Sequence, residues 1–194
     1  MSKTIEYYFD YVSPFTYLAN TQLPGILERT GAVIDYRPVL LGALQKTAEN
    51  PPPITVPNKS KYMMSDLSRW AKRYGVTIQF NPAFPINTVT LLRAALVTLE
   101  DGSFPLFHEA MFDAMWRNPK NLGDEAVVRE VLEGAGLDAH EILQRTQEQA
   151  IKDRLKANTS EAHARGAFGA PTFFVGDEMY FGNDRLDFVE EALK

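Results

Sequence analysis

The chain has 194 residues, of which 45% are hydrophobic and 23% are charged, and it contains no cysteine. This length fits one domain, or one domain with a sizeable insertion, and supplies enough apolar residues for a core. The net charge of -5 argues against nucleic acid as the main partner, because phosphate binding favours a positive balance. Without cysteine, the protein has no thiol of its own for dithiol chemistry.

The sequence has no apolar run of the about 18 residues that a membrane-spanning helix needs. Residues 1–4 lead directly into a strand pattern, without the apolar core of a signal peptide. We therefore expect no membrane partner and a cytoplasmic location. The absence of cysteine is compatible with a reducing compartment but does not require one.

The first element is predicted to be a buried strand, because residues 5–9 are aromatic and β-branched. Pro14 suits the first turn of a helix, which makes Ser13 a candidate N-cap. Apolar spacing continues this helix, with a kink expected at Pro24 and an end at Gly31.

A second strand is predicted at residues 33–37 and ends at Pro38. The opening is therefore a βαβ unit with a parallel pair of strands and a right-handed crossover. A short helix at residues 40–47 leads into a stiff, polar, proline-rich loop within residues 46–61. The next helix covers residues 62–74 and ends at Gly75.

Four helical stretches follow at residues 88–100, 105–117, 124–135 and 139–165, the last with a break near Ala150. Met111, Phe112, Met115 and Trp116 have helical spacing and are predicted to be core residues. His108 and His140 lie beside acidic residues in these helices and are expected to be exposed. The three histidines lack the spacing of metal ligands, so no metal site is predicted.

The chain closes with two strands, at residues 172–175 and 178–181, around the hairpin signal Gly176-Asp177. A final helix covers residues 185–193. The order βαβ, helices, ββα predicts an α/β protein with a thioredoxin-like fold and a large all-helical insertion. Residues 1–40 and 166–194 would form the thioredoxin-like domain, and residues 41–165 the mostly helical insertion domain.

Ser13 has two interpretations. Serine before proline is a common helix N-cap and needs no further explanation. However, a helix N-terminus also favours a nearby anion and lowers the pKa of a thiol. A hydroxyl at this position would then donate a hydrogen bond to the thiolate of a bound molecule.

The dipeptide Ala170-Pro171 also has two interpretations. Proline can simply start a strand, where its missing N–H is tolerated. Alternatively, the bond is cis, which would present the backbone N–H and C=O of Ala170 to an extended ligand.

The segment Phe181-Gly182-Asn183-Asp184 precedes the last helix, which Asn183 or Asp184 would cap. In a functional interpretation, the N–H groups of this helix bind a carboxylate while Asp184 pairs with an amine.

The proline-rich loop and its flanks carry Lys46, Asn50, Asn58, Lys59 and Lys61. These residues form either a solvated loop or a grip on an acidic ligand. Nucleotide-binding and α/β-hydrolase motifs are missing from the sequence.

As a set, four segments resemble those of the 2-hydroxychromene-2-carboxylate isomerases and the kappa-class glutathione transferases: residues 9–19, 46–63, 166–172 and 181–185. The resemblance spans essentially the whole chain. It implies the thioredoxin-like fold with a helical insertion, glutathione as the cofactor, and a homodimer.

The resemblance also implies roles for individual residues. Ser13 would activate the glutathione thiol, and Ala170, before Pro171, would pair with the cysteinyl backbone. Other residues that it assigns to glutathione binding are Asn50, Lys59, Phe181, Gly182, Asn183 and Asp184. Lys46, Asn58 and Phe84 would face the substrate. Two departures stand out: isomerases often have a larger aliphatic residue at Ala170, and Phe84 stands where a substrate-binding tyrosine is expected.

The resemblance thus implies a glutathione-dependent isomerase that acts on 2-hydroxychromene-2-carboxylate or a related aromatic 2-oxo acid, through addition and elimination of the thiolate. One alternative is a kappa-like transferase, which would release a conjugate. Another is a thioredoxin-fold binding module without chemistry, although such a module would have no need for both Ser13-Pro14 and Ala170-Pro171.

Overall fold

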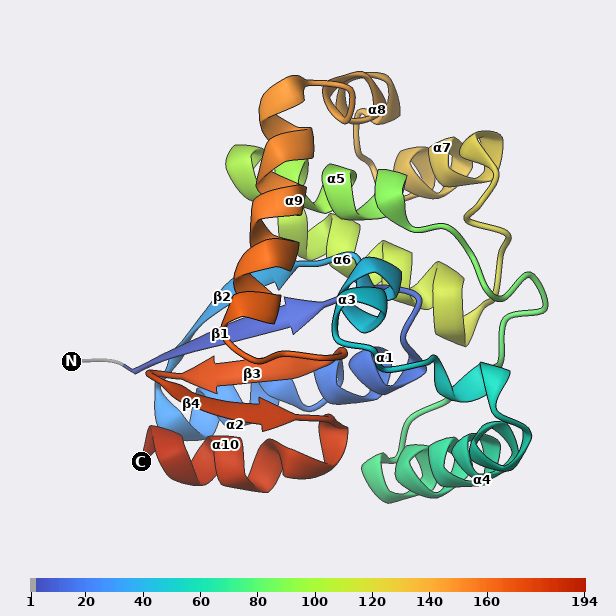
Figure 1. The fold of residues 1–194 in the computed structure, drawn as a ribbon. Helices are drawn as coiled ribbons and strands as arrows, with labels where there is room; N and C mark the ends of the chain where they lie inside the picture. The colour runs from blue at the N-terminus through green and yellow to red at the C-terminus, as the bar shows by residue number, and fades with distance from the viewer. Residues whose placement is uncertain (1–2) are drawn as a thin grey trace.

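A single mixed sheet of four strands organises the computed structural model, which describes residues 3–194 (Figure 1). The strand order is β2-β1-β3-β4, formed by β1 (Thr4–Phe9), β2 (Val33–Pro38), β3 (Thr172–Val175) and β4 (Glu178–Phe181). β1 pairs in parallel with β2, as the βαβ prediction requires, and the other two pairs are antiparallel. The first strand of the chain and a strand from its last quarter, β1 and β3, therefore lie side by side at the centre of the sheet.

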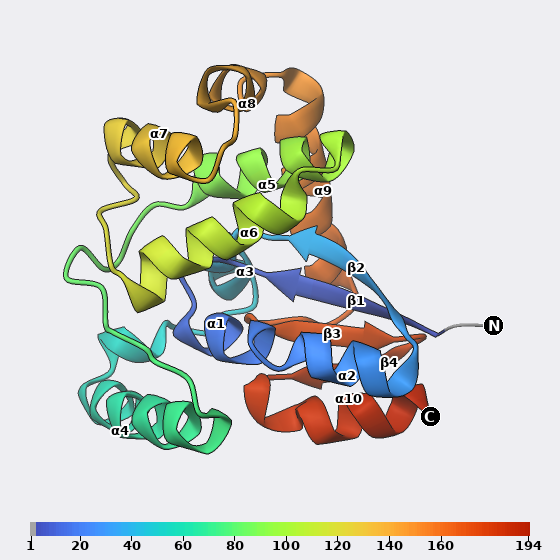
Figure 2. The ribbon, with the colours of Figure 1, turned by 180° about the vertical axis from the view of Figure 1, so that it is seen from behind.

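Helices cover both faces of this sheet, because side chains alternate along its central strands. Tyr7, Phe9 and Phe173 belong to the larger core, together with residues of α1 (Pro14–Asn20), α2 (Leu23–Thr30) and α10 (Leu186–Leu193). On the other face, Tyr8 and Phe174 pack with residues of α3 (Leu41–Thr47) and α9 (Gln149–Ala164). The view from behind shows α1 and α2 across the sheet from α3 (Figure 2).

The kink expected at Pro24 is a complete break. α1 ends at Asn20 and α2 starts at Leu23, which leaves Pro24 in the first turn of the second helix, where its missing N–H is tolerated. Gly31 ends α2 in the left-handed conformation, as predicted.

The proline-rich loop is shorter than residues 46–61. Lys46 lies in the last turn of α3, a 3₁₀ turn covers Pro53–Thr55, and α4 (Pro57–Tyr74) begins five residues before the predicted start at Tyr62. Pro57, which we expected to belong to the loop, is the first residue of this helix, a position that proline favours. Asn58 and Lys59 are therefore helical.

The helical block consists of α5 (Val89–Asp101), α6 (Phe104–Phe112), a π-helical turn (Asp113–Arg117), α7 (Glu125–Gly134), α8 (Ala139–Arg145) and α9. The break predicted near Ala150 lies slightly earlier, between Arg145 and Gln149. A 3₁₀ turn, Asn183–Arg185, leads into α10. None of the helices in residues 3–194 is both long and apolar enough to cross a membrane.

The predicted core residues Met111, Phe112, Met115 and Trp116 are all buried. The expectation for His108 is wrong. This residue is 6% exposed, and its ring nitrogens lie 2.9 Å from the hydroxyl of Tyr11 and 2.9 Å from Oδ1 of Asn20. Burial lowers the pKa of His108 to about 3, so the imidazole is neutral near pH 7.

Candidate active site

Ser13 lies where β1 passes into α1, and its hydroxyl takes part in two hydrogen bonds. Oγ accepts from the backbone N–H of Thr16 at 3.2 Å, which makes Ser13 the N-cap predicted from the sequence. The hydroxyl donates to the carbonyl oxygen of Ala170 at 2.9 Å. Ser13 is 4% exposed, while its neighbours Val12 and Pro14 line a cavity.

The peptide bond between Ala170 and Pro171 is cis, which was one of the two possibilities left open by the sequence. Ala170 lies beside Ser13 although 157 residues separate them in the chain. In this structure, the Ala170 carbonyl accepts the Ser13 hydroxyl, so a ligand would have to share or replace that contact.

The segment before α10 lies next to this pair. The N–H of Gly182 donates to the carbonyl of Pro171 at 3.0 Å. Asn183 is buried, and its carbonyl accepts from the Tyr74 hydroxyl at 2.8 Å. The exposed Asp184 carboxylate pairs with Arg185 at 2.6 Å. The Asn183 side chain is thus enclosed by the protein, whereas the Asp184 carboxylate is accessible to an amine.

A ring contact and an amide hydrogen bond hold the residues before Ala170 in place. Phe181 packs on Phe168, with 4.5 Å between the ring centroids. The Asn50 amide donates to the Phe168 carbonyl at 3.0 Å. A Cβ on Gly169 would lie 2.7 Å from the Phe181 ring, so glycine is needed for this close approach.

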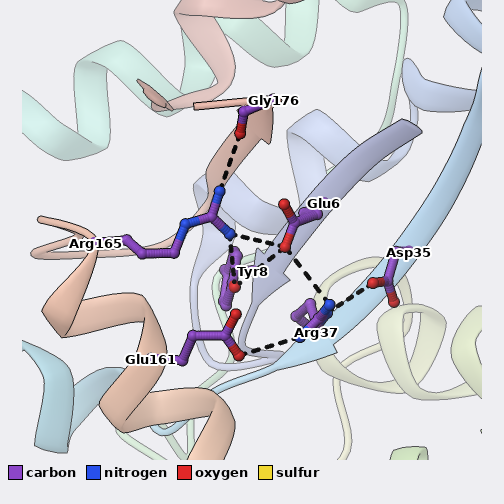
Figure 3. A network of polar contacts seen from close by, with 7 residues as sticks. All are labelled: Glu6, Tyr8, Asp35, Arg37, Glu161, Arg165 and Gly176. Atoms are coloured by element: carbon purple, nitrogen blue, oxygen red, sulfur yellow. Dashed lines mark hydrogen bonds and ion pairs between the residues drawn. The ribbon is translucent and has the colours of Figure 1, made fainter. Parts of the chain in front are cut away.

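An ionic network on the face of the sheet that α9 covers anchors the start of the same loop (Figure 3). Arg165, at the end of α9, donates to Glu6 Oε2 at 2.8 Å, to the Tyr8 hydroxyl at 3.3 Å and to the Gly176 carbonyl at 3.1 Å. Its guanidinium also lies 3.8 Å from the centroid of the Phe174 ring, a cation–π contact. Arg165 therefore ties together α9, β1 and the β3–β4 hairpin.

Arg37 continues this network from β2. Its guanidinium pairs with Asp35 at 2.7 Å, with Glu161 at 3.1 Å and with Glu6 at 3.6 Å (Figure 3). Two guanidinium groups thus share the Glu6 carboxylate, and the loop that carries Ala170 leaves the network directly after Arg165.

A cavity of about 660 Å³ opens beside Ser13 and Ala170. The cofactor-site residues from the sequence prediction that line it are Asn50, Ala170, Pro171, Phe181, Gly182, Asn183 and Asp184. Phe84 lines it as well, and the Phe84 ring packs on Phe80 and Trp116. Most of the remaining lining is apolar, including Phe15, Leu41, Ile54, Met63 and Ile86.

Four predicted residues lie outside this lining. Ser13 is buried between Val12 and Pro14, which do line the cavity. Lys46, Asn58 and Lys59 are exposed, although Lys46 directly follows Gln45, which also lines it. Among residues 3–194, the charged side chains that line the cavity are Asp10, Asp66 and Asp184, all of them carboxylates. Any lysine contribution to an anionic ligand would therefore come from the rim.

Asp10 was not among the site residues predicted from the sequence, yet it lines the cavity three residues before Ser13 and is 1% exposed. Burial raises the pKa of its carboxyl, and hydrogen bonds from Thr88, Leu41 and Val12 act in the opposite direction. Two of these partners, Leu41 and Thr88, lie 31 and 78 positions away, so no local pattern in the sequence indicates them.

A mixed four-stranded sheet, a helix capped by Ser13 and a facing cis-proline together define a thioredoxin-like protein. The chain belongs to the family described as "DSBA-like thioredoxin domain", whose model matches residues 4–194.

Within this family, the chain is similar to 2-hydroxychromene-2-carboxylate isomerase from Sphingobium xenophagum. The two are 37% identical over 195 residues, which cover 100% of this chain and 99% of the relative. It is also 28% identical to glutathione S-transferase kappa 1 from Caenorhabditis elegans, over 98% of this chain and 90% of that one. A solved structure of a 2-hydroxychromene-2-carboxylate isomerase matches with a TM-score of 0.88 and 30% identity, covering 98% of this chain and 94% of the other. The family resemblance predicted from the sequence is confirmed.

Proposed function

We propose that this protein is a glutathione-dependent isomerase of 2-hydroxychromene-2-carboxylate or a related aromatic 2-oxo acid. The observation that carries the proposal is the Ser13 hydroxyl facing Ala170 and its cis-proline, in a chain without cysteine. Such a site can bind a thiol but has to obtain it from another molecule. The similarity to 2-hydroxychromene-2-carboxylate isomerases supports the acceptor class.

The cavity offers groups that fit glutathione. The accessible Asp184 carboxylate suits an ammonium group, and the turn that starts at Asn183 has backbone N–H groups for a carboxylate. Asn50 supplies an amide to the cavity lining. We propose that Lys59 acts from the rim on the anionic tripeptide, and that Lys46 and Asn58 act there on the acceptor carboxylate.

When bound, glutathione supplies a nucleophilic thiolate that adds to the acceptor and leaves it again. The part of Ser13 is to hold that negative charge. Rotation about the Cβ–Oγ bond would turn the hydroxyl hydrogen from the Ala170 carbonyl to the sulfur, while Oγ keeps the Thr16 N–H. The start of α1 adds its partial positive charge, which favours the ionised thiol.

The apolar walls give the acceptor a place beside this sulfur. Phe15, Leu41, Ile54 and Phe84 offer an apolar surface to an aromatic ring. Because the charged lining groups are carboxylates, we place the acceptor carboxylate at the rim. There the strong hydration of a carboxylate need not be lost.

A second candidate function is a kappa-like glutathione transferase, which the similarity to the Caenorhabditis elegans protein favours. Product analysis separates the two. We expect incubation with glutathione and 2-hydroxychromene-2-carboxylate to give an isomer of unchanged mass, with the thiol titre constant. A stable conjugate with matching loss of thiol would instead identify a transferase.

Binding without turnover would leave a thioredoxin-fold binding module. Glutathione at about 100 times its Kd should stabilise the fold by about 2.7 kcal/mol, which a thermal shift detects. No shift and no retention on immobilised glutathione at millimolar ligand would contradict all three readings. We also propose a homodimer, and sedimentation velocity tests it directly.

A further inference from the structure

The Asp10 carboxylate accepts hydrogen bonds from three segments that are far apart in sequence. The donors are the Val12 N–H at 3.1 Å, the Leu41 N–H at 2.9 Å and the Thr88 hydroxyl at 2.7 Å. The backbone carbonyl of Asp10 also accepts the N–H of Ser13 at 3.1 Å. One buried residue therefore contacts parts of the chain up to 78 positions away.

Each of these segments is the start of a helix. Val12 precedes α1, whose N-cap is Ser13, and Leu41 is the first residue of α3. The N-cap of α3 is Leu40, whose apolar side chain cannot accept a hydrogen bond. The Asp10 carboxylate accepts the N–H of Leu41 in its place. Thr88 is the N-cap of α5, yet its hydroxyl donates to Asp10 instead of capping its own helix.

The three helix starts are also three walls of the cavity. Val12, Pro14 and Phe15 line it from α1, residues 40–43 line it from α3, and residues 84–88 line it before α5. Burying a carboxylate is costly unless it is fully hydrogen-bonded, and a well-packed apolar side chain is often at least as stabilising. Stability alone therefore does not explain why a carboxylate is buried at this junction.

We propose that Asp10 is the positioning residue of the site. It holds the helix start that carries Ser13 at a fixed distance from the two walls that receive the acceptor. This role rests on the proposed function, because it assigns the α3 and α5 walls to the acceptor and the α1 start to the thiol.

The first test removes one of the three bonds and leaves the charge in place. Thr88→Val deletes the hydroxyl, and Thr88→Ser restores it. Thr98→Val is the matched control, because Thr98 is buried in the same helix and bonds only to carbonyls of Ala94 and Ala95. We expect Thr88→Val to raise the acceptor KM about tenfold over the control, the loss of one hydrogen bond to a charged group. Glutathione affinity should change less than about twofold.

Thermal unfolding distinguishes positioning from stability. Both valine variants delete a buried hydroxyl, and Thr88→Val should lose more stability because its bond is to a carboxylate. Only Thr88→Val should also raise KM, and Thr88→Ser should restore it. Equal KM values in the two valine variants would overturn the proposal, and so would a KM that Thr88→Ser leaves raised.

A second measurement does not need catalysis, so it stands even if wild-type protein shows no glutathione-dependent turnover and the proposed function fails. Asp10→Asn replaces an acceptor oxygen by a donor. Amide hydrogen exchange should then accelerate about tenfold or more in residues 40–47 and 84–92 and stay unchanged in α7. Unchanged exchange in the first two segments would show that Asp10 does not hold these walls.

Discussion

The hydroxyl of Ser13 has one hydrogen to donate, and in this structure the Ala170 carbonyl receives it. Binding of a thiol at this place therefore involves an exchange of partners rather than the simple addition of one. Since Oγ also accepts the Thr16 N–H, the oxygen stays where it is and only the hydrogen has to turn. The serine is prearranged for donation, and a thiolate is a stronger acceptor than a carbonyl.

We predict that Ser13→Ala folds with a loss of about 1 kcal/mol, the usual effect of a lost N-cap. The pKa of bound glutathione, measured from thiolate ultraviolet absorbance, should rise, and turnover should fall at least about tenfold, because one donor to the sulfur is lost. Ser103→Ala is the control, since Ser103 also precedes a helix with proline in its first turn.

Two results would contradict this role. Turnover of Ser13→Ala at the wild-type rate would show that the hydroxyl does not act on the thiol. A covalent adduct between Ser13 and the substrate, trapped by mass spectrometry, would make the serine itself the nucleophile.

Lys59 is exposed in the first turn of α4, outside the cavity lining. We predict that Lys59→Ala weakens glutathione binding by less than about 1 kcal/mol, because water and salt screen an exposed charge. Calorimetry at low and high salt should show the larger effect at low salt. Lys61→Ala, two residues away on the same helix and also exposed, is the control. Equal glutathione affinities of the two variants at low salt would show that Lys59 makes no specific contact with glutathione.

Elements rather than single residues set the position of the Ala170 loop. The loop begins directly after Arg165 and ends where β3 starts. Arg165 also donates to the carbonyl of Gly176, in the turn between β3 and β4, and so links the start of the loop to the hairpin that follows it. The guanidinium matches this arrangement because it donates in several directions in one plane and also stacks on Phe174.

We predict that Arg165→Lys lowers the free energy of unfolding by about 1–2 kcal/mol, since an ammonium cannot keep all of these contacts. Hydrogen exchange should increase in residues 166–170, and glutathione affinity should fall with it. Arg154→Lys is the control. Arg154 lies on α9, the helix that ends beside Arg165, and its exposed guanidinium pairs with Glu100 of α5. Urea unfolding that gives equal stabilities for the two variants would contradict the anchoring role.

The strands were predictable from the sequence because their signals are local. Residues 172–175 and 178–181 flank Gly176-Asp177, and the structure places β3 and β4 at the same limits. The start of α4 was not predicted, because a proline such as Pro57 fits a loop as well as the first position of a helix.

The site residues also differ in whether a local sequence signal indicates them. Ser13 and Pro171 could be found because each sits next to a local signal, a helix start and a strand start. Asp10 and His108 could not, since their environments are made by residues that lie 78 and 97 positions away, Thr88 and Tyr11. Spacing along the sequence carries no record of such pairs.

At the scale of the whole molecule, His108 links stability to pH. Burial lowers the pKa of His108 to about 3 in the folded protein, whereas an unfolded histidine titrates near about 6.5. Between these values the unfolded chain binds the proton and the folded protein does not, so stability decreases as the pH falls below about 6.5.

We predict that this one group removes about 2 kcal/mol of folding free energy between pH 7 and pH 5, and that His108→Gln abolishes that part of the slope. His140→Gln, at an exposed helical position, is the control. Urea unfolding at several pH values provides the measurement. A slope that is the same in His108→Gln and in the wild-type protein would contradict the assignment.

The pairing of β1 with β3 at the centre of the sheet has a consequence for synthesis on the ribosome. Ser13 is made 157 residues before its partner Ala170, which at about 5–20 residues per second is an interval of about 8–30 s. During that time β1 can pair with β2 alone, and its other edge stays open until β3 arrives. Nascent protein should therefore depend on chaperones that shield this edge until the last strands have left the ribosome.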